Sequence, residues 1–205
     1  MRKFQLIIVF TFLSFQCSAQ SNWKQFWKQS RPMKKWILLH PFKADKALKI
    51  SMEANRVSDS IAQTPLLDND VAGGQVDAFR HAYWMARLHQ EIGKCAARSL
   101  GKAHERDNFR SFKKFQLENN NPPDKASREM DLYNNNVGLS FSKKGVYRSR
   151  NGLIYKIANA ILKGDLKIIK KDASGNYLTC NNNKIPPEEL LYTWENKKCV
   201  ISSKR

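Results

Sequence analysis

The stretch that decides the fold is Gln75–Ile92, QVDAFRHAYWMARLHQEI. Apolar residues recur through it with helical period and Gly93 follows it, so it predicts the strongest helix of the chain. At about 100° per residue, one face of this helix carries four side chains of unusual character for an interior: Asp77, Arg80, His81 and Trp84. Because buried charges are costly unless they are paired, this face must meet polar partners on other helices.

The remaining elements follow from apolar period, capping residues and glycine stops. Further helices are predicted over Phe42–Ala62, from Cys95 to about Arg106, from the N-cap Asp124 to about Asn136 with an end near Gly138, and over Asn151–Lys163 before Gly164. After Gly164 the pattern changes, and Leu166–Ile169 and Tyr177–Cys180 flank a turn at Asp172–Asn176, which predicts a hairpin. The expected fold is mainly α, a single orthogonal helical domain with a small C-terminal β-hairpin appendage.

Four segments are expected along the chain. Residues 1–20 form a signal peptide, and residues 21–62 form basic amphipathic helices that pack on the domain. Residues 63–164 form the helical core with the polar motifs, and residues 165–205 form the hairpin and tail. The roughly 185 residues after the leader are enough for one domain with a proper core.

The leader predicts export. Arg2 and Lys3 precede the apolar run Leu6–Phe15, which is too short to span a bilayer, and small residues follow it at 17–19. We therefore expect a secreted or periplasmic bacterial protein. An alternative is a lipoprotein anchored through Cys17.

Export makes disulfides plausible. Three cysteines follow the leader, and Cys180 and Cys199 are spaced to close a loop across the tail. Cys95 lies among alanines in a helical stretch, so we expect one disulfide, Cys180–Cys199, and one buried thiol. No paired cysteine spacing indicates a zinc–cysteine site, so a metal would need histidine and oxygen ligands.

The charge of the chain is strongly positive. The formal net charge is +18, and loss of Arg2 and Lys3 with the leader leaves 34 − 18 = +16. The excess is densest over residues 24–56, where nine Lys/Arg face only Asp45 and Glu53. Such a field attracts nucleic acid, an anionic wall polymer or an anionic lipid surface, but a merely soluble surface explains it equally well. No specific partner is indicated, and we expect a monomer.

Two further clusters place scarce polar residues in helices. His104 and Glu105 come near the end of one predicted helix, and Asp131, Asn134 and Asn135 share a face of another. A divalent metal could be held by five residues from the three clusters: Asp77, His81, His104, Glu105 and Asp131. Asn134 or Asn135 would then be a neutral oxygen ligand or would orient the ligands, and Trp84 would support them.

Two other interpretations of the three polar clusters remain open. Without a metal, His81 or His104 could act as a general base held by Asp77 or Asp131, with Arg80 stabilising an oxyanion. His104-Glu105 lacks the second histidine of the His-Glu-x-x-His metalloprotease pattern, which excludes that class. Alternatively, the whole network is structural and only fixes how the helices pack.

The motifs also resemble a known family. The order Asp-Ala-Phe-Arg-His-Ala-x-Trp, then His-Glu, then Met-Asp-x-x-Asn-Asn-x-x-Gly, from Asp77 to Gly138, resembles an uncharacterised bacterial domain family. Its members occur in secreted proteins and at the C-terminal ends of exported toxin-like polypeptides. This family usually has a histidine where the present chain has Tyr133.

The resemblance implies that the site lies at the motif positions, which are Asp77, Arg80, His81, Trp84, His104, Glu105, Asp131, Asn134, Asn135 and Gly138. Because family members occur in toxin-like polypeptides, the resemblance also implies a hydrolase. We therefore expect a secreted hydrolase, metal-assisted in one version, that acts on a phosphodiester or ester bond. Its catalytic residues would be His81, His104 and Arg80. The alternative is a non-enzymatic basic binding module in which the buried Asp, Arg, His, Glu and Asn network is structural.

Overall fold

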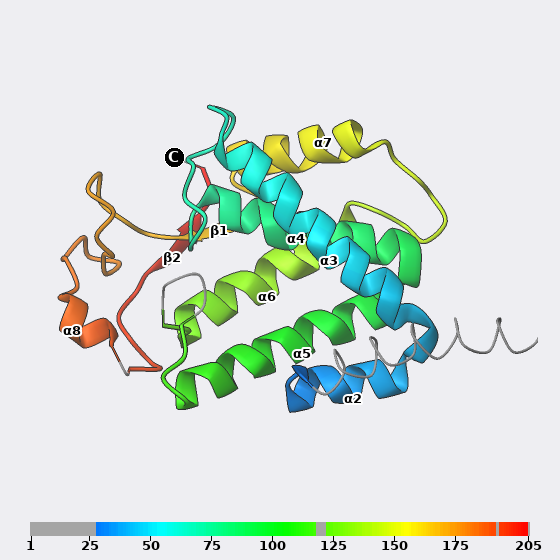
Figure 1. Ribbon diagram of the computed structural model, residues 1–205. Coiled ribbons are helices and arrows are strands. Elements are labelled where there is room, and N and C mark those ends of the chain that lie inside the picture. The colour runs from blue at the N-terminus through cyan, green and yellow to red at the C-terminus, as the bar shows by residue number, and fades with distance from the viewer. Residues whose placement is uncertain (1–27, 118–121, 192, 205) are drawn as a thin grey trace, which may run out of the picture.

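The computed structural model describes residues 28–117, 122–191 and 193–204 (Figure 1). The expected signal peptide and the amphipathic residues up to Trp27 lie outside the described residues. The described part is mainly helical with a small two-stranded antiparallel sheet, as the fold class predicted. Its elements are α2 (Arg31–Leu39), α3 (Pro41–Ala62), α4 (Gln75–Ile92), α5 (Lys94–Lys113), α6 (Lys125–Ser140), α7 (Arg150–Lys163), β1 (Lys167–Ile169), α8 (Pro187–Leu190) and β2 (Val200–Ser202).

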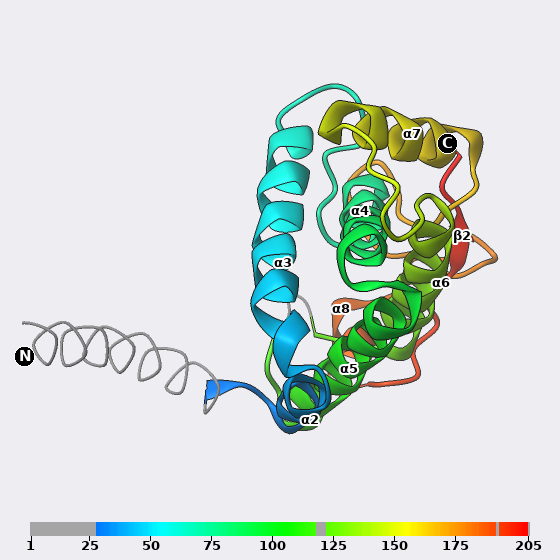
Figure 2. The ribbon, with the colours of Figure 1, turned by 90° about the vertical axis from the view of Figure 1, so that its right-hand side faces the viewer.

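Helix α4 is the centre of the domain. It has the predicted bounds, Gln75–Ile92, and 15 of its 18 residues are buried. It contacts α3, α5, α6 and α7, and Figure 2 shows it enclosed among them. A helix buried on nearly all sides must bury its polar residues too, and this brings Asp77 and His81 into the interior.

Helix α6 crosses α4 at very short range. Its start is as predicted, since the Asp124 side chain accepts a hydrogen bond from the backbone N–H of Ser127 at 2.7 Å. The helix ends at Ser140, shortly after the predicted end near Gly138. Gly138 allows α6 to pack closely against α4, because a side chain at this position would collide with the backbone of Ala82.

Helix α5 is longer than predicted and runs from Lys94 to Lys113. The expectation that Cys95 is a buried thiol is wrong, because Cys95 is exposed and unbridged. The inward face of the first turns is formed by Ala96, Ala97 and Leu100, and Cys95 precedes them on the outward side.

Helix α2 holds the basic N-terminal part of the described chain against the domain. Its single buried residue, Trp36, donates from Nε1 to the carbonyl oxygen of Ala96 at 3.2 Å and to Ser99 Oγ at 2.9 Å. Both acceptors belong to α5, so α2 packs across α5 while its basic side chains remain at the surface. No helix among the described residues is both long and apolar enough to cross a membrane.

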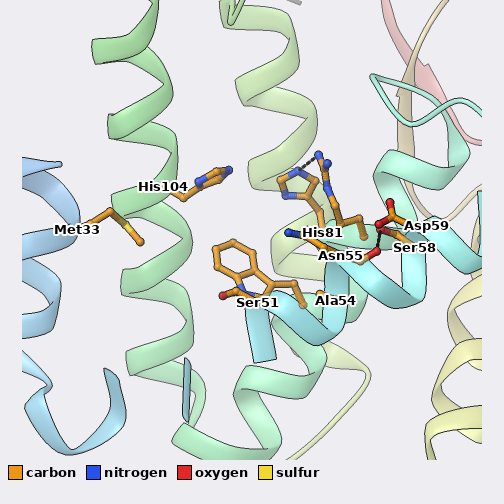
Figure 3. A pocket seen from close by; sticks show the side chains of 10 residues that line it. Met33, Ser51, Ala54, Asn55, Ser58, Asp59, His81 and His104 are labelled. Atoms are coloured by element: carbon orange, nitrogen blue, oxygen red, sulfur yellow. Dashed lines mark hydrogen bonds between the residues drawn. The ribbon is translucent and has the colours of Figure 1, made fainter. Parts of the chain in front are cut away.

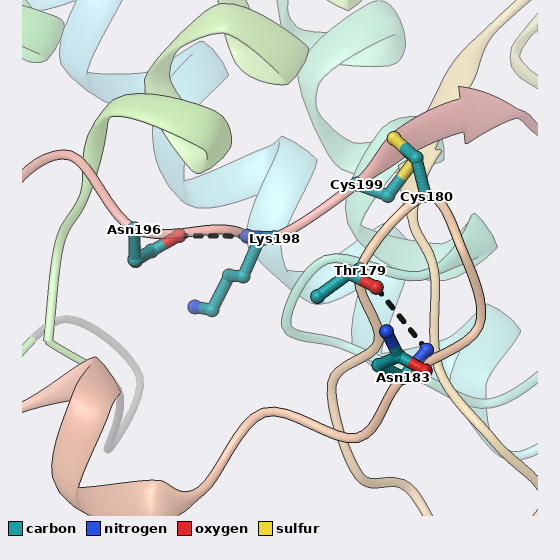
Figure 4. The surroundings of a disulfide bond; sticks show 6 residues. All are labelled: Thr179, Cys180, Asn183, Asn196, Lys198 and Cys199. Atoms are coloured by element: carbon teal, nitrogen blue, oxygen red, sulfur yellow. Dashed lines mark hydrogen bonds between the residues drawn. A yellow bond between two sulfur atoms is a disulfide. The ribbon is translucent and has the colours of Figure 1, made fainter.

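The C-terminal part pairs differently from the predicted hairpin. The turn at Asp172–Asn176 is present, but only the isolated bridge Lys171–Tyr177 closes it. Strand β1 instead pairs with β2, with Ile168 opposite Ile201. The structure joins Cys180 to Cys199 just before β2, as the spacing indicated (Figure 4).

A buried ion pair ties the tail to α6. Lys198 Nζ lies 2.6 Å from Asp124 Oδ2, and the two side chains are each 2 % exposed. Asn196 donates to the same carboxylate oxygen at 2.8 Å. The tail therefore fastens the first turn of α6, the helix that carries Asp131.

Candidate active site

The loop before α4 fixes the direction of Asp77. Asp77 Oδ2 accepts a hydrogen bond from the backbone N–H of Gly73 at 2.7 Å, and the carbonyl oxygen of Gly73 accepts one from Ile169 of β1. Gly73 has φ +91°, which favours glycine at this position. Asp68 accepts the N–H of Gln75 at 2.8 Å and so caps the helix. Asp77 is thus held at the first turn of α4, with Oδ2 bound to Gly73 and Oδ1 directed toward His81.

Three side chains from two helices converge at this end of α4. His81 Nε2 lies 3.6 Å from Asp77 Oδ1 and 3.3 Å from Asp131 Oδ1. One ligand atom from each residue lies within 4.8 Å of both others, and all three residues are buried. One imidazole nitrogen and two carboxylate oxygens form a mixed donor set for a divalent metal ion.

The second nitrogen of His81 is held by Asn135. His81 Nδ1 lies 3.3 Å from Asn135 Oδ1. An amide oxygen only accepts, so with Asn135 in this orientation Nδ1 carries the hydrogen and the lone pair of Nε2 faces the two carboxylates. Burial lowers the pKa of His81 well below its ordinary value, and the charge of Arg80, with that of His104 when His104 is protonated, lowers it further. The imidazole is therefore neutral at neutral pH, the state that binds metals.

Arg80 places a cation beside the same atoms. Its Nη2 donates to Asp77 Oδ1 and lies 3.4 Å from His81 Nε2. The Arg80 side chain is 21 % exposed, so the guanidinium extends from the buried carboxylate toward solvent. It can hold the network together or stabilise a negative charge at the surface of the site.

A cleft of about 500 Å³ opens in front of His81. Figure 3 shows His81 and His104 on opposite sides of it, with Asn55, Ser58 and Asp59 along another wall. The ring centroids of His81 and His104 are 6.2 Å apart, and His104 meets the Trp84 ring edge-on at 5.6 Å. Trp84 is anchored by a 2.9 Å hydrogen bond to Ser51 of α3. The three-residue cluster thus lies behind a cleft with two histidines at its wall.

The structure separates several residues that the sequence grouped together. Among the described residues, the close donor group consists of Asp77, His81 and Asp131, and Glu105 and His104 fall outside it. His104 lines the cleft, whereas its neighbour Glu105 is turned into the interior and is 1 % exposed. Successive residues on a helix point about 100° apart, which explains why the pair divides.

Two residues of α6 also lie away from the cleft. The side-chain amide of Asn134 exchanges two 2.9 Å hydrogen bonds with the backbone of Lys167, so it holds the start of β1. Tyr133, where the resembling family has a histidine, is 44 % exposed and lies under the ammonium group of Lys167. Of the three polar α6 positions, Asp131 and Asn135 reach His81 and Asn134 does not.

The α3 wall of the cleft was not foreseen from the sequence. Its polar members are Ser51, Asn55, Ser58 and Asp59. These polar residues recur with helical spacing among the apolar residues of Phe42–Ala62. Their spacing indicates a polar face on this helix beside the apolar one. Apolar period alone had indicated only that this helix packs on the domain.

Residues 34–165 match the model of a family described as a domain of unknown function, DUF6973. The match covers more than half of the chain. The chain belongs to this family. The matched residues include the Asp77–His81–Asp131 cluster, Gly138 and all of the cleft lining except Met33, whereas the disulfide-linked tail follows them. No curated protein matches the chain, and no solved structure matches it.

Proposed function

We propose that this DUF6973 domain is a metal-dependent hydrolase that cleaves a phosphodiester or ester bond. Asp77, His81 and Asp131 would hold the divalent cation. The observation that carries the proposal is the meeting of one imidazole nitrogen with two carboxylate oxygens behind an open cleft. Arg80 compensates the charge of Asp77, and a divalent cation between the two carboxylates would compensate both of them.

A divalent cation in such a site supplies a water of lowered pKa and polarises the phosphoryl or carbonyl oxygen. The residues of the chain perform the remaining tasks. Asn135 keeps the His81 lone pair directed at the carboxylates, because it binds the opposite ring nitrogen. Arg80, at the boundary between carboxylate and cleft, stabilises negative charge that develops on the substrate.

His104 lies across the cleft from His81 and is placed to move the proton. As the water oxygen bonds to phosphorus or the acyl carbon, His104 takes the water proton. The bond to the leaving oxygen breaks, and His104 returns the proton to that oxygen. The products are an acid and an alcohol.

The test measures metal binding and hydrolysis separately. The chain without its leader is titrated calorimetrically with Mn²⁺ and Zn²⁺, and assayed on bis(4-nitrophenyl) phosphate and 4-nitrophenyl butyrate. Asp131→Asn should weaken metal binding about 100-fold or more and remove hydrolysis. Asp165→Asn is the matched control at an exposed position and should change neither. Absence of both metal binding and hydrolysis in the unaltered chain would refute the proposal.

A second candidate function is a non-enzymatic binding module with a structural polar network. The position of Arg80 favours it, because this guanidinium contacts Asp77 and approaches His81 at the atoms a metal would use. In that case Arg80→Gln destabilises the fold and added metal does not restore it. In the metal-dependent case, Zn²⁺ or Mn²⁺ restores the stability of the Arg80→Gln variant by binding the native state.

We also propose that the protein acts in the secreted or periplasmic space. The leader at residues 1–20 and the Cys180–Cys199 disulfide support this location. Fractionation of producing cells tests it, with a leaderless chain as the control. Cys17→Ser separates free export from lipoprotein anchoring, since only an anchored protein leaves the membrane fraction when Cys17 is changed.

A further inference from the structure

An apolar groove of about 380 Å³ lies beside the cleft, between α2 and α3. Most of its lining is hydrophobic: Trp36, Ile37, Pro41, Ala44 and Leu48 are among its walls. Met33 and Ser51 line both the groove and the cleft, so the two spaces meet at these residues. A ligand that spans them would have an apolar part in the groove and a polar part facing His81 and His104.

The corner between α2 and α3 carries an apolar surface cluster next to this groove. Leu38 is 69 % exposed, Leu39 is 67 % exposed and Phe42 is fully exposed. Figures 1 and 2 show this corner at an edge of the domain, far from the β-strands. Its neighbours in the chain, Ile37 and Pro41, line the groove. Three large exposed apolar residues in one turn form a contact surface for an apolar phase.

Basic residues precede and follow the apolar corner along the chain. Residues 28–49 contain seven Lys/Arg and one carboxylate, Asp45, a local net charge of 7 − 1 = +6. Asp45 is itself paired with Lys49 at 2.8 Å. A second cleft of about 690 Å³ at the start of α2 shares Gln29 with the groove. Its charged lining consists of five basic residues and one carboxylate: Lys28, Arg31, Lys34, Arg110, Lys114 and Asp107. Apolar residues amid lysines are the pattern of a surface that binds anionic membranes.

We propose that the α2–α3 corner docks on an anionic phospholipid bilayer and that the substrate is a phospholipid whose acyl chain enters the groove. The apolar lining favours a lipid over a polyanion such as nucleic acid, which would leave the groove and Phe42 without a partner. The ester or phosphodiester bond would then lie in the cleft, past Met33 and Ser51, where His81 and His104 form part of the lining. The choice of substrate rests on the proposed hydrolase function, whereas the docking does not.

Docking is tested by co-sedimentation of the leaderless chain with vesicles. Vesicles of phosphatidylcholine with about 30 % phosphatidylglycerol present an anionic surface that attracts basic residues. They are compared with vesicles of pure phosphatidylcholine. We expect binding to the anionic vesicles, and Phe42→Ser together with Leu39→Ser should weaken it at least tenfold. Tyr155→Ser, at an exposed aromatic residue on α7, is the matched control and should bind as the unaltered chain does.

Two outcomes would overturn the docking. One is equal binding of the unaltered chain and the corner variant. The other is binding that depends only on residues 21–27, shown by a chain that lacks them. The second outcome would assign membrane contact to the amphipathic segment that precedes the described residues.

The groove is tested with a chain-length series of phosphatidylglycerols. Ala44→Leu narrows the groove, and we expect it to lower hydrolysis of long-chain lipid at least tenfold while hydrolysis of bis(4-nitrophenyl) phosphate stays unchanged. Ala173→Leu, the same substitution in an exposed turn, is the control. Equal loss on the lipid and on the small diester, or no loss on either, would overturn the acyl-chain assignment.

These measurements separate failure of this inference from failure of the proposed hydrolase. Metal-dependent cleavage of the small diester without vesicle binding leaves the hydrolase standing and overturns the lipid inference. Vesicle binding that requires Phe42, without any hydrolysis, supports the docking and overturns the lipid as a substrate.

Discussion

Gly138 of α6 lies so close to Ala82 of α4 that a Cβ built on Gly138 would be 2.4 Å from the Ala82 carbonyl oxygen. Ala82 follows His81, and Asn135 lies one turn before Gly138, so this contact sets the distance between the two halves of the candidate site. The obstacle is backbone, which cannot rotate away as a flexible side chain can. The helices must separate if any side chain is added.

Gly138→Ala should therefore destabilise the fold by roughly 1–3 kcal/mol or more, despite the better helix propensity of alanine. It should also weaken metal binding, because Asp131 moves away from His81. Urea denaturation and calorimetric metal titration measure the two effects. Gly152→Ala on α7 is the matched control. Its new Cβ meets only the hydroxyl of Ser149, which caps α7 and can shift, so the loss should be clearly smaller than for Gly138→Ala. An unaltered midpoint for Gly138→Ala would contradict the close contact.

Asn135→Leu should lower metal affinity about 10- to 100-fold without touching a metal ligand, because it frees the Nδ1 side of His81. Substitution removes the acceptor that selects the ring orientation. Asn136→Leu, the exposed neighbour, is the control. NMR of the His81 ring nitrogens gives an independent readout: the fraction protonated on Nδ1 should fall in Asn135→Leu and stay constant in the control. A metal affinity equal to that of the unaltered chain would remove Asn135 from the positioning role.

The surroundings of Glu53, away from the site, predict that the free energy of unfolding depends on pH. Burial raises the pKa of this carboxyl, but hydrogen bonds from Tyr83 and Arg87 and the charges of Arg87 and Arg150 outweigh burial and leave it below its ordinary value. Tyr83 donates to Glu53 at 2.6 Å, which joins α4 to α3. A lowered folded-state pKa means that the stabilisation is complete above the unfolded pKa of about 4.3 and is lost as the pH falls through the folded value.

Glu53→Gln should accordingly cost about 1–2 kcal/mol at pH 7 and progressively less below pH about 4. Urea denaturation at several pH values between about 3 and 7 measures the difference between variant and unaltered chain. Glu129→Gln, on the solvent side of α6, should show no such convergence. A difference that stays constant with pH would exclude the charged form of Glu53 as the source of the stabilisation.

The ion pair Lys198–Asp124 should behave as a unit. Lys198→Met leaves a buried carboxylate without its cation and should cost about 3–5 kcal/mol. Adding Asp124→Asn removes the stranded charge and keeps a side chain that can cap α6, so the double variant should recover much of the loss. A double-mutant cycle by denaturation measures the coupling; additive losses would mean that the pair is not coupled.

Helix existence was largely predictable from local sequence, because caps, glycines and apolar period act within a few residues. Helix α4 has the predicted bounds, α6 starts after its Asp124 cap, and α7 ends at Gly164 with φ +93°. The grouping of Asp77 and His81 on one buried face was also predictable, since a four-residue spacing fixes a common direction on any helix.

Only the tertiary structure decided which residues these helix faces contact. Local pattern could not tell that Asp131 and Asn135 meet His81 while Asn134 binds β1, because that choice depends on how α6 crosses α4 at Gly138. Nor could it tell that β1 pairs with β2 across the disulfide-linked tail instead of with the nearer segment. Such pairings depend on which surfaces remain to be buried once the helices have packed. This depends on the whole chain and not on the local sequence.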